Sequence, residues 1–343
     1  MLRWLSILLL LTGLLVGLGY LGLDYWFRTG RMPLIDSDPR VATAGTSVRL
    51  LVAPGASLTR VATQLEQLEL IDRPELFRLK VRLLGAAGRI QAGEYDVPTA
   101  ATPAEILELL AQGTVVKRRL VIVEGIRTRE LLQQLQGTEG LKQELPAELS
   151  LEDLPSVLGV PVGHAEGWFF PDTYQYRRGD SDRALLLRAY QRMQQALDDA
   201  WTSRDDELPY EDPYALLTMA SIIEKETGQA ADRPQIAQVF VRRLQQGMRL
   251  QTDPTVIYGL GDRFDGDLRR RDLEADTPYN TYTRFGLPPT PIALPGNAAL
   301  EAAAHPAAGD YLYFVARGDG SSVFSRTLAE HNAAVRRYQL RRQ

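Results

Sequence analysis

The chain has 343 residues, of which 45% are hydrophobic, enough to build a sizeable core. It carries 39 Lys and Arg against 43 Asp and Glu, which gives a net charge of −4. The chain therefore lacks the excess of basic residues that is typical of nucleic-acid-binding proteins. There is no cysteine and the three histidines lie far apart, which argues against disulfides, thiol nucleophiles and metal sites, and no cofactor is predicted.

The first predicted element is an apolar helix. Residues 4–23 are almost entirely apolar, close to the ~20 residues that a helix needs to cross a bilayer. Trp4 and Trp26 flank the run and suit the two aromatic belts of a membrane. Because no A-x-A-like cleavage site follows directly, an uncleaved anchor over residues 1–27 is favoured over a signal peptide. Basic residues near both ends are nearly balanced, so this end of the chain leaves the orientation open.

A small set of strands and helices follows a polar linker at residues 28–46. Residues 48–52 predict a strand, and leucines at helical spacing predict a helix after it. Residues 91–97 predict a second strand, and residues 103–110 a helix with Thr102 as its N-cap.

The opening pattern partly recurs further along. Residues 51–55 and 121–125 are each a strand that ends in glycine and leads into a helix. Two related α/β units in tandem would explain this, but the same pattern is common in any α/β protein, and both interpretations stay open.

Past residue 150 the chain predicts longer helices and long loops. Residues 184–201 have a helical pattern, and residues 250–296 are rich in Pro, Gly, Tyr and Asp, as in irregular binding surfaces. Residues 311–316 predict a buried strand and 328–340 a terminal helix. The predicted fold class is therefore α+β, with an N-terminal transmembrane helix, a small α/β subdomain and a larger α+β domain.

The helix that follows Asp212-Pro213 carries the candidate chemistry. Asp212 is a typical N-cap, and Gly228 is expected to end the helix. On the helical wheel Glu224 falls within the apolar arc, where a carboxyl group favours its protonated form, the state that a general acid needs. Glu226 also has apolar wheel neighbours, so the wheel cannot choose between them. Both glutamates could instead be ordinary exposed residues at a helix end.

Six stretches in order resemble the MltG/YceG-like endolytic murein transglycosylases, and the match covers essentially the whole chain. One such motif would be weak evidence, whereas six in the same order are specific. They are EGWFFPDTY at 166–174, ASIIEKET at 220–227, LQTDPTVIYG at 250–259, TPYNTY at 277–282, GLPPTPI at 286–292 and YLYFVA at 311–316.

The resemblance implies that Glu224 is the catalytic residue and that peptidoglycan glycan strands are the substrate. It implies a LysM-like subdomain at 47–115 and a catalytic domain at 116–343. It also implies a single-pass protein of the inner membrane with a periplasmic catalytic domain, with cell-wall synthases as candidate partners. One departure is that the family usually carries Gly-Gly-His-x-Phe after the last motif, whereas this chain has serine at the histidine position, in GSSVF at 320–324.

The implied reaction explains how one carboxyl group suffices. The acid protonates the glycosidic oxygen after N-acetylmuramic acid, and its carboxylate then takes the proton from that sugar's C6 hydroxyl. The hydroxyl attacks C1 and closes a 1,6-anhydro ring. This nucleophile is intramolecular, so its high effective molarity replaces the second carboxylate of a hydrolase.

Further motif residues are candidate substrate contacts. Tyrosines could stack on sugar rings or pack in the core with satisfied hydroxyls, and Asp253 could contact substrate or cap a helix. The candidates are Glu166, Tyr174, Gln251, Asp253, Tyr279, Asn280 and Tyr282.

Two other functions stay open. The first is an anchored glycan-binding scaffold of the cell-wall synthesis machinery with a weak or inactive catalytic domain. The second is a hydrolytic muramidase, whose second carboxylate would be Glu166, Asp172 or Asp253.

Overall fold

A long apolar helix, α1 (Leu2–Thr29), begins the chain in this computed structural model, which describes residues 2–31 and 46–339. Among these residues it is the one helix that is long and apolar enough to cross a membrane, over Trp4–Thr29. It continues several residues beyond the predicted apolar run. Most of the predicted linker, residues 32–45, lies outside the described residues.

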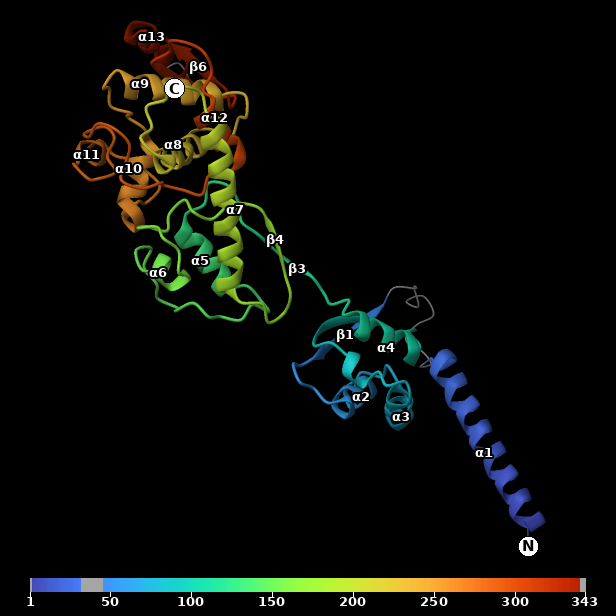
Figure 1. Cartoon of the computed structure of the whole chain (residues 1–343). Helices are drawn as coiled ribbons and strands as arrows, with labels where there is room; N and C mark the ends of the chain where they lie inside the picture. The colour runs from blue at the N-terminus through green and yellow to red at the C-terminus, as the bar shows by residue number, and fades with distance from the viewer. Residues whose placement is uncertain (1, 32–45, 340–343) are drawn as a thin grey trace. The chain divides into compact units, whose positions relative to one another are not determined.

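The chain divides into two compact units, residues 1–118 and 119–343 (Figure 1). The first contains α1 and a two-stranded antiparallel sheet in which Leu50 pairs with Tyr95. Alternate residues of both strands point into a core that the helices cover, as the period of two in a half-buried strand requires. After α1 its elements are β1 (Ser47–Val52), α2 (Leu58–Gln67), α3 (Pro74–Leu83), a 3₁₀ turn (Ala87–Arg89), β2 (Gly93–Pro98) and α4 (Pro103–Gln112).

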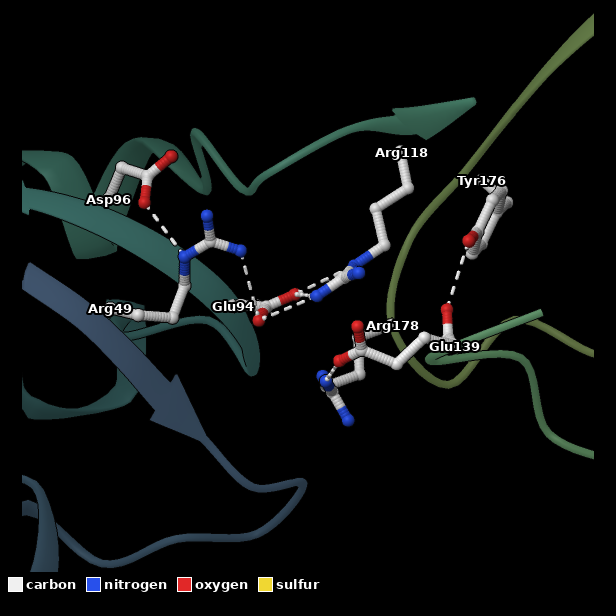
Figure 2. A network of polar contacts seen from close by, with 7 residues as sticks. All are labelled: Arg49, Glu94, Asp96, Arg118, Glu139, Tyr176 and Arg178. Carbon is white, nitrogen blue, oxygen red and sulfur yellow. Dashed lines mark hydrogen bonds and ion pairs between the residues drawn. The ribbon is translucent and has the colours of Figure 1, made fainter. Parts of the chain in front are cut away.

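A buried carboxylate organises the other face of this sheet. The side chain of Glu94 on β2 is only 5% exposed, and it pairs with Arg49 at 3.1 Å and Arg118 at 3.1 Å (Figure 2). Arg49 also donates to Asp96 at 2.8 Å. Because a buried charge is tolerated only when it is paired, this network fixes β1, β2 and the segment that leaves the unit in one arrangement.

The second unit is mostly helical, with two further two-stranded sheets, β3–β4 and β5–β6. Together with the first unit this confirms the predicted mixture of helices and sheet. Its elements are β3 (Arg118–Val121), α5 (Thr128–Gln136), α6 (Leu154–Leu158), β4 (Thr173–Tyr176), α7 (Asp182–Ser203), α8 (Pro213–Glu226), α9 (Arg233–Gln245), α10 (Asp253–Leu260), a 3₁₀ turn (Gly261–Arg263), α11 (Arg270–Glu274), α12 (Asn297–Ala304), β5 (Tyr313–Ala316), β6 (Ser322–Ser325) and α13 (Leu328–Tyr338).

The end of β4 is tied to the loop after α5. The backbone oxygen of Glu139 accepts from the Tyr176 hydroxyl at 2.9 Å, and its carboxylate accepts from Arg178 at 2.6 Å (Figure 2). These bonds join two segments of the second unit that are far apart in the sequence.

The central element of the second unit is α8, which packs against α7, α9, α10 and α12 (Figure 1). Asp212 accepts the N–H of Ala215 at 2.8 Å and Pro213 is the first helical residue, which confirms the predicted helix start. Eight consecutive residues, 216–223, are buried, so the helix is enclosed on every side over two turns. It ends at Glu226, which brings both candidate glutamates to its last turn.

Candidate functional site

The carboxylate of Glu224 is held by polar groups inside the protein. One oxygen accepts from the Arg233 guanidinium at 3.2 Å and the other from the backbone N–H of Gly296 at 3.0 Å. The side chains of this ion pair are 5% and 10% exposed. The helical wheel predicted apolar surroundings for Glu224. This prediction is wrong for the carboxylate itself, because α9 and the loop before α12 bring hydrogen-bond donors to both of its oxygens.

Glu226, two residues later, lies in the wall of a cavity of about 520 Å³. Its carboxyl group accepts a hydrogen bond from the Thr252 hydroxyl. Burial, helped by the charge of Asp253, raises the pKa of Glu226 to about 7, against the lowering effects of the Thr252 hydrogen bond and the charge of Arg243. A carboxyl group with a pKa near 7 is populated in both forms at neutral pH, which suits a general acid and base.

Three of the predicted substrate contacts line the same cavity: Gln251, Asp253 and Tyr282. Asp253 opens α10 without a helix-capping bond, and its carboxylate accepts from the Tyr282 hydroxyl at 2.6 Å. Gln251 has a φ of 53°, in the left-handed region that costs a non-glycine residue energy, and its N–H donates to Thr281 at 3.1 Å. The structure therefore gathers these side chains around Glu226.

The rest of the cavity wall comes from the C-terminal strands and helix. Tyr313 of β5 stacks on His331 of α13 with ring centroids 5.3 Å apart, and the buried Arg243 lies 5.2 Å from the Tyr313 ring. Ser322 of β6, which stands where the family usually has histidine, is also in the wall. Sequence reasoning missed His331 and Arg243, since both lie outside the motifs that carry the resemblance. The wall combines polar groups with aromatic faces, as sites for sugars commonly do.

Glu166 and Tyr279 belong to a different cluster, around Tyr258. Glu166 is fully buried and accepts from the Thr128 N–H at 2.8 Å, the Thr128 hydroxyl at 2.9 Å and the Tyr258 hydroxyl at 3.1 Å. Burial raises the pKa of this carboxyl group. The Tyr279 ring lies 4.8 Å from that of Tyr258, and its hydroxyl pairs with Thr290 at 2.9 Å. These contacts join the start of α5 to α10, and both residues also line a second cavity of about 290 Å³.

Two further candidates are buried with their polar atoms in use. The Tyr174 hydroxyl donates to the Phe170 carbonyl at 2.7 Å. Asn280 has no exposed surface, and its carbonyl accepts the N–H of Tyr282 at 2.9 Å. Its amide donates to three carbonyls at 2.7–3.2 Å, those of Asp272, Leu273 and Ala275. In this structure neither residue presents a free polar atom to a sugar.

We expect Asn280→Asp to destabilise the second unit by about 2–3 kcal/mol, because an isosteric carboxylate would face three carbonyl oxygens without donating to them. Denaturant unfolding measures this change. Asn297→Asp is the matched control, since Asn297 is exposed at the start of α12, where a negative charge is tolerated. Unchanged stability together with lost activity would instead indicate that Asn280 contacts the substrate.

Among residues 2–31 and 46–339, no group of three or more His, Asp and Glu side chains is arranged to hold a metal ion. What the cavity offers is proton transfer. Glu226 is the group with a pKa near neutral and accepts from Thr252, and the hydrogen-bonded pair of Asp253 and Tyr282 lies in the same wall.

Comparison with known proteins gives a consistent result. A family model described as the YceG-like family matches residues 50–337. A Bacillus subtilis (strain 168) protein named endolytic murein transglycosylase is 34% identical over 317 residues, which cover 88% of this chain and 87% of that protein. A Streptococcus pneumoniae serotype 2 (strain D39) protein of the same name is 27% identical over 352 residues, covering 92% of this chain and 62% of that protein.

A solved structure agrees with these relatives. The crystal structure of a YceG-like protein from Listeria monocytogenes superimposes with a TM-score of 0.52 and 30% sequence identity. The match covers 84% of this chain and 98% of that one.

Proposed function

The chain belongs to the YceG-like family, and from that premise we propose that it is a lytic transglycosylase that cuts peptidoglycan glycan strands, with Glu226 as its acid and base. The observation that carries the assignment is the cavity around Glu226, where burial raises the pKa of this carboxyl group to about 7. Glu224, the residue that the family resemblance implies, has both oxygens engaged by Arg233 and Gly296. The proposal therefore places the acid at Glu226, and Glu224, which the resemblance implies, stays the alternative that the two Glu→Gln variants distinguish.

The proposed reaction has two proton transfers and no water. Protonated Glu226 gives its proton to the glycosidic oxygen that follows N-acetylmuramic acid, and the bond from that oxygen to C1 breaks. The Glu226 carboxylate then takes the proton of the C6 hydroxyl while that oxygen bonds to C1. The products are a 1,6-anhydro-N-acetylmuramic acid end and a free hydroxyl on the departing strand, and Glu226 regains its proton.

Asp253 and Tyr282 support this cycle from beside the acid. The negative charge of Asp253 disfavours a second negative charge on Glu226 and so helps to keep the proton there before the reaction. The Tyr282 hydroxyl donates to Asp253 at 2.6 Å, which fixes the position of that carboxylate beside Glu226. The aromatic pair of Tyr313 and His331 offers a stacking surface for a sugar ring.

A second candidate is a hydrolase in which Asp253 is the second carboxylate. Its presence in the same cavity as Glu226 favours this alternative. It would release reducing ends instead of anhydro ends, because water would attack C1.

We further propose that α1 anchors the protein as a single-pass span of the inner membrane, with the second unit outside the cytoplasm. The length and composition of α1 support the anchor. The strand–helix–helix–strand order of β1, α2, α3 and β2 supports a LysM-like assignment for the first unit. An anchored enzyme would meet new strands where they emerge, which makes cell-wall synthases its proposed partners and nascent strand length the quantity it limits.

Digestion of purified sacculi tests the function directly. The full-length protein in detergent is incubated with sacculi, and the new ends are identified by mass spectrometry. We expect 1,6-anhydro ends. Reducing ends would support the hydrolase, and the absence of new ends from a folded, glycan-binding protein would support a scaffold.

A further inference from the structure

Helix α3 carries apolar side chains that the first unit does not bury. Leu79 and Leu83 are one turn apart and 48% and 58% exposed, and Leu84 at the helix end is 51% exposed. On the other side of the same helix, Phe77 and Val81 are fully buried in the core. A stripe of leucines on a surface helix is typical of an interaction surface.

This stripe lies beside the end of α1. Lys80, which sits next to Leu79 on α3, is only 2% exposed, and its ammonium donates to Asp24 at 2.7 Å and to the Tyr20 hydroxyl at 3.4 Å. The ring of Phe27 lies 6.1 Å from that of Phe77. Helix α3 therefore packs directly against the last turns of α1.

The sequence of α1 sets the level at which a bilayer would end. From Trp4 to Leu23 there is no charged residue, and Asp24 is the first. A helix of this length spans about 30 Å, which is the thickness of the hydrocarbon core. The Asp24–Lys80 pair then lies at the boundary between hydrocarbon and headgroups, and the leucines next to Lys80 lie at the same level.

Charge near the leucines matches an anionic lipid surface. Basic residues outnumber acidic ones here. The arginines are Arg78 and Arg82 on α3 and Arg89 just after it, and the one acidic residue of the helix is Glu75. Arg82 and Arg89 are exposed. Apolar side chains flanked by arginines are the pattern of helices that lie in a membrane interface.

We propose that α3 and the turn after it bind the surface of an anionic lipid bilayer through Leu79, Leu83 and Leu84. The first unit is then held on the membrane by α3 as well as by α1. This inference rests on the proposed function only in requiring that α1 crosses the membrane.

The absence of cysteine allows a direct test with single labels. Leu83→Cys is labelled with an environment-sensitive fluorophore in the full-length protein, which is reconstituted into phosphatidylcholine vesicles containing phosphatidylglycerol. Leu51→Cys is the matched control: Leu51 is similarly exposed, at 46%, but lies on β1 between Leu50 and Val52, which point into the core. Leu51 therefore faces away from the helices.

We expect the label at position 83 to shift to the blue and to be quenched by lipids that carry a spin label near the headgroup. The label at position 51 should show neither change. Equal quenching at both positions, or none at position 83, would overturn the proposal.

A charge-reversal variant tests the role of the arginines. Arg82→Glu combined with Arg89→Glu should reduce quenching at position 83 in phosphatidylglycerol vesicles to the level seen in phosphatidylcholine alone. Unchanged quenching would contradict the choice of an anionic surface. Flotation of the same samples separates the two proposals, because protein that does not float contradicts the anchor. Floating protein with an unquenched label contradicts only the binding of α3.

Discussion

Glu226→Gln is expected to lower the rate of glycan cleavage by about 10²–10⁴-fold, because the amide can neither give a proton to the glycosidic oxygen nor take one from the C6 hydroxyl. The change is isosteric, and the amide oxygen can still accept from Thr252. Folding and glycan binding should therefore be retained. The measurement is the rate at which new anhydro ends appear in sacculi, per amount of folded protein.

Glu224→Gln is the matched control, two residues away on the same helix. Removing its charge leaves Arg233 without its ionic partner in a mostly buried setting, so a loss of stability of about 1–3 kcal/mol is expected. The cleavage rate per folded molecule should stay within tenfold of the unmodified protein. If Glu224→Gln abolished cleavage and Glu226→Gln did not, the assignment made from the sequence would be correct and ours would be wrong.

The second large effect is on stability as a function of pH. The pKa of Glu226 is raised from 4.5 to about 7, so the folded protein binds this proton more tightly than the unfolded chain does. The unfolding free energy that Glu226 contributes is then fully present below pH 4.5 and is lost as the pH rises through 7. A shift of this size corresponds to about 3 kcal/mol.

Glu226→Gln removes this loss of stability at higher pH, because glutamine does not ionise. The variant should match the unmodified protein near pH 4 and exceed its unfolding free energy by up to about 3 kcal/mol at pH 8. Denaturant unfolding of both proteins in the same detergent measures the difference, in which other titrating groups cancel. A difference that does not change with pH would mean that burial does not raise the pKa of this carboxyl group.

Local sequence rules predicted the beginning of α8 correctly. Asp212 and Pro213 define the start of α8 through contacts within four residues, which a sequence reports directly. The apolar run at the N-terminus likewise predicted α1, whose extra turns are stabilised by contacts of Phe27 with distant residues.

The choice between the two glutamates could not be made from the helix alone. A helical wheel gives the direction of a side chain but not what another segment brings to it. Arg233 and Gly296 come to Glu224 from α9 and from the loop before α12. The cavity around Glu226 is assembled from α10, β5, β6 and α13, and these contacts exist only in the folded chain.

The irregular region at 250–296 was predicted as a binding surface, and it supplies Asp253 and Tyr282 to the cavity. It also forms the short helices α10 and α11. These helices were not predicted, because the many prolines and glycines of the region are typical of loops. The motif residues Glu166 and Asn280 illustrate a different difficulty. Their polar groups are used to hold loops and helix ends, and a sequence pattern does not distinguish such a residue from one that touches substrate.

The enclosure of α8 determines how the enzyme should lose activity. Because residues 216–223 are buried on every side, their amide protons should exchange with solvent only when the whole second unit unfolds. The two turns that lead to the proposed acid therefore have no local opening of their own. On heating, cleavage activity and the slowest-exchanging amides should disappear together, in a single cooperative transition.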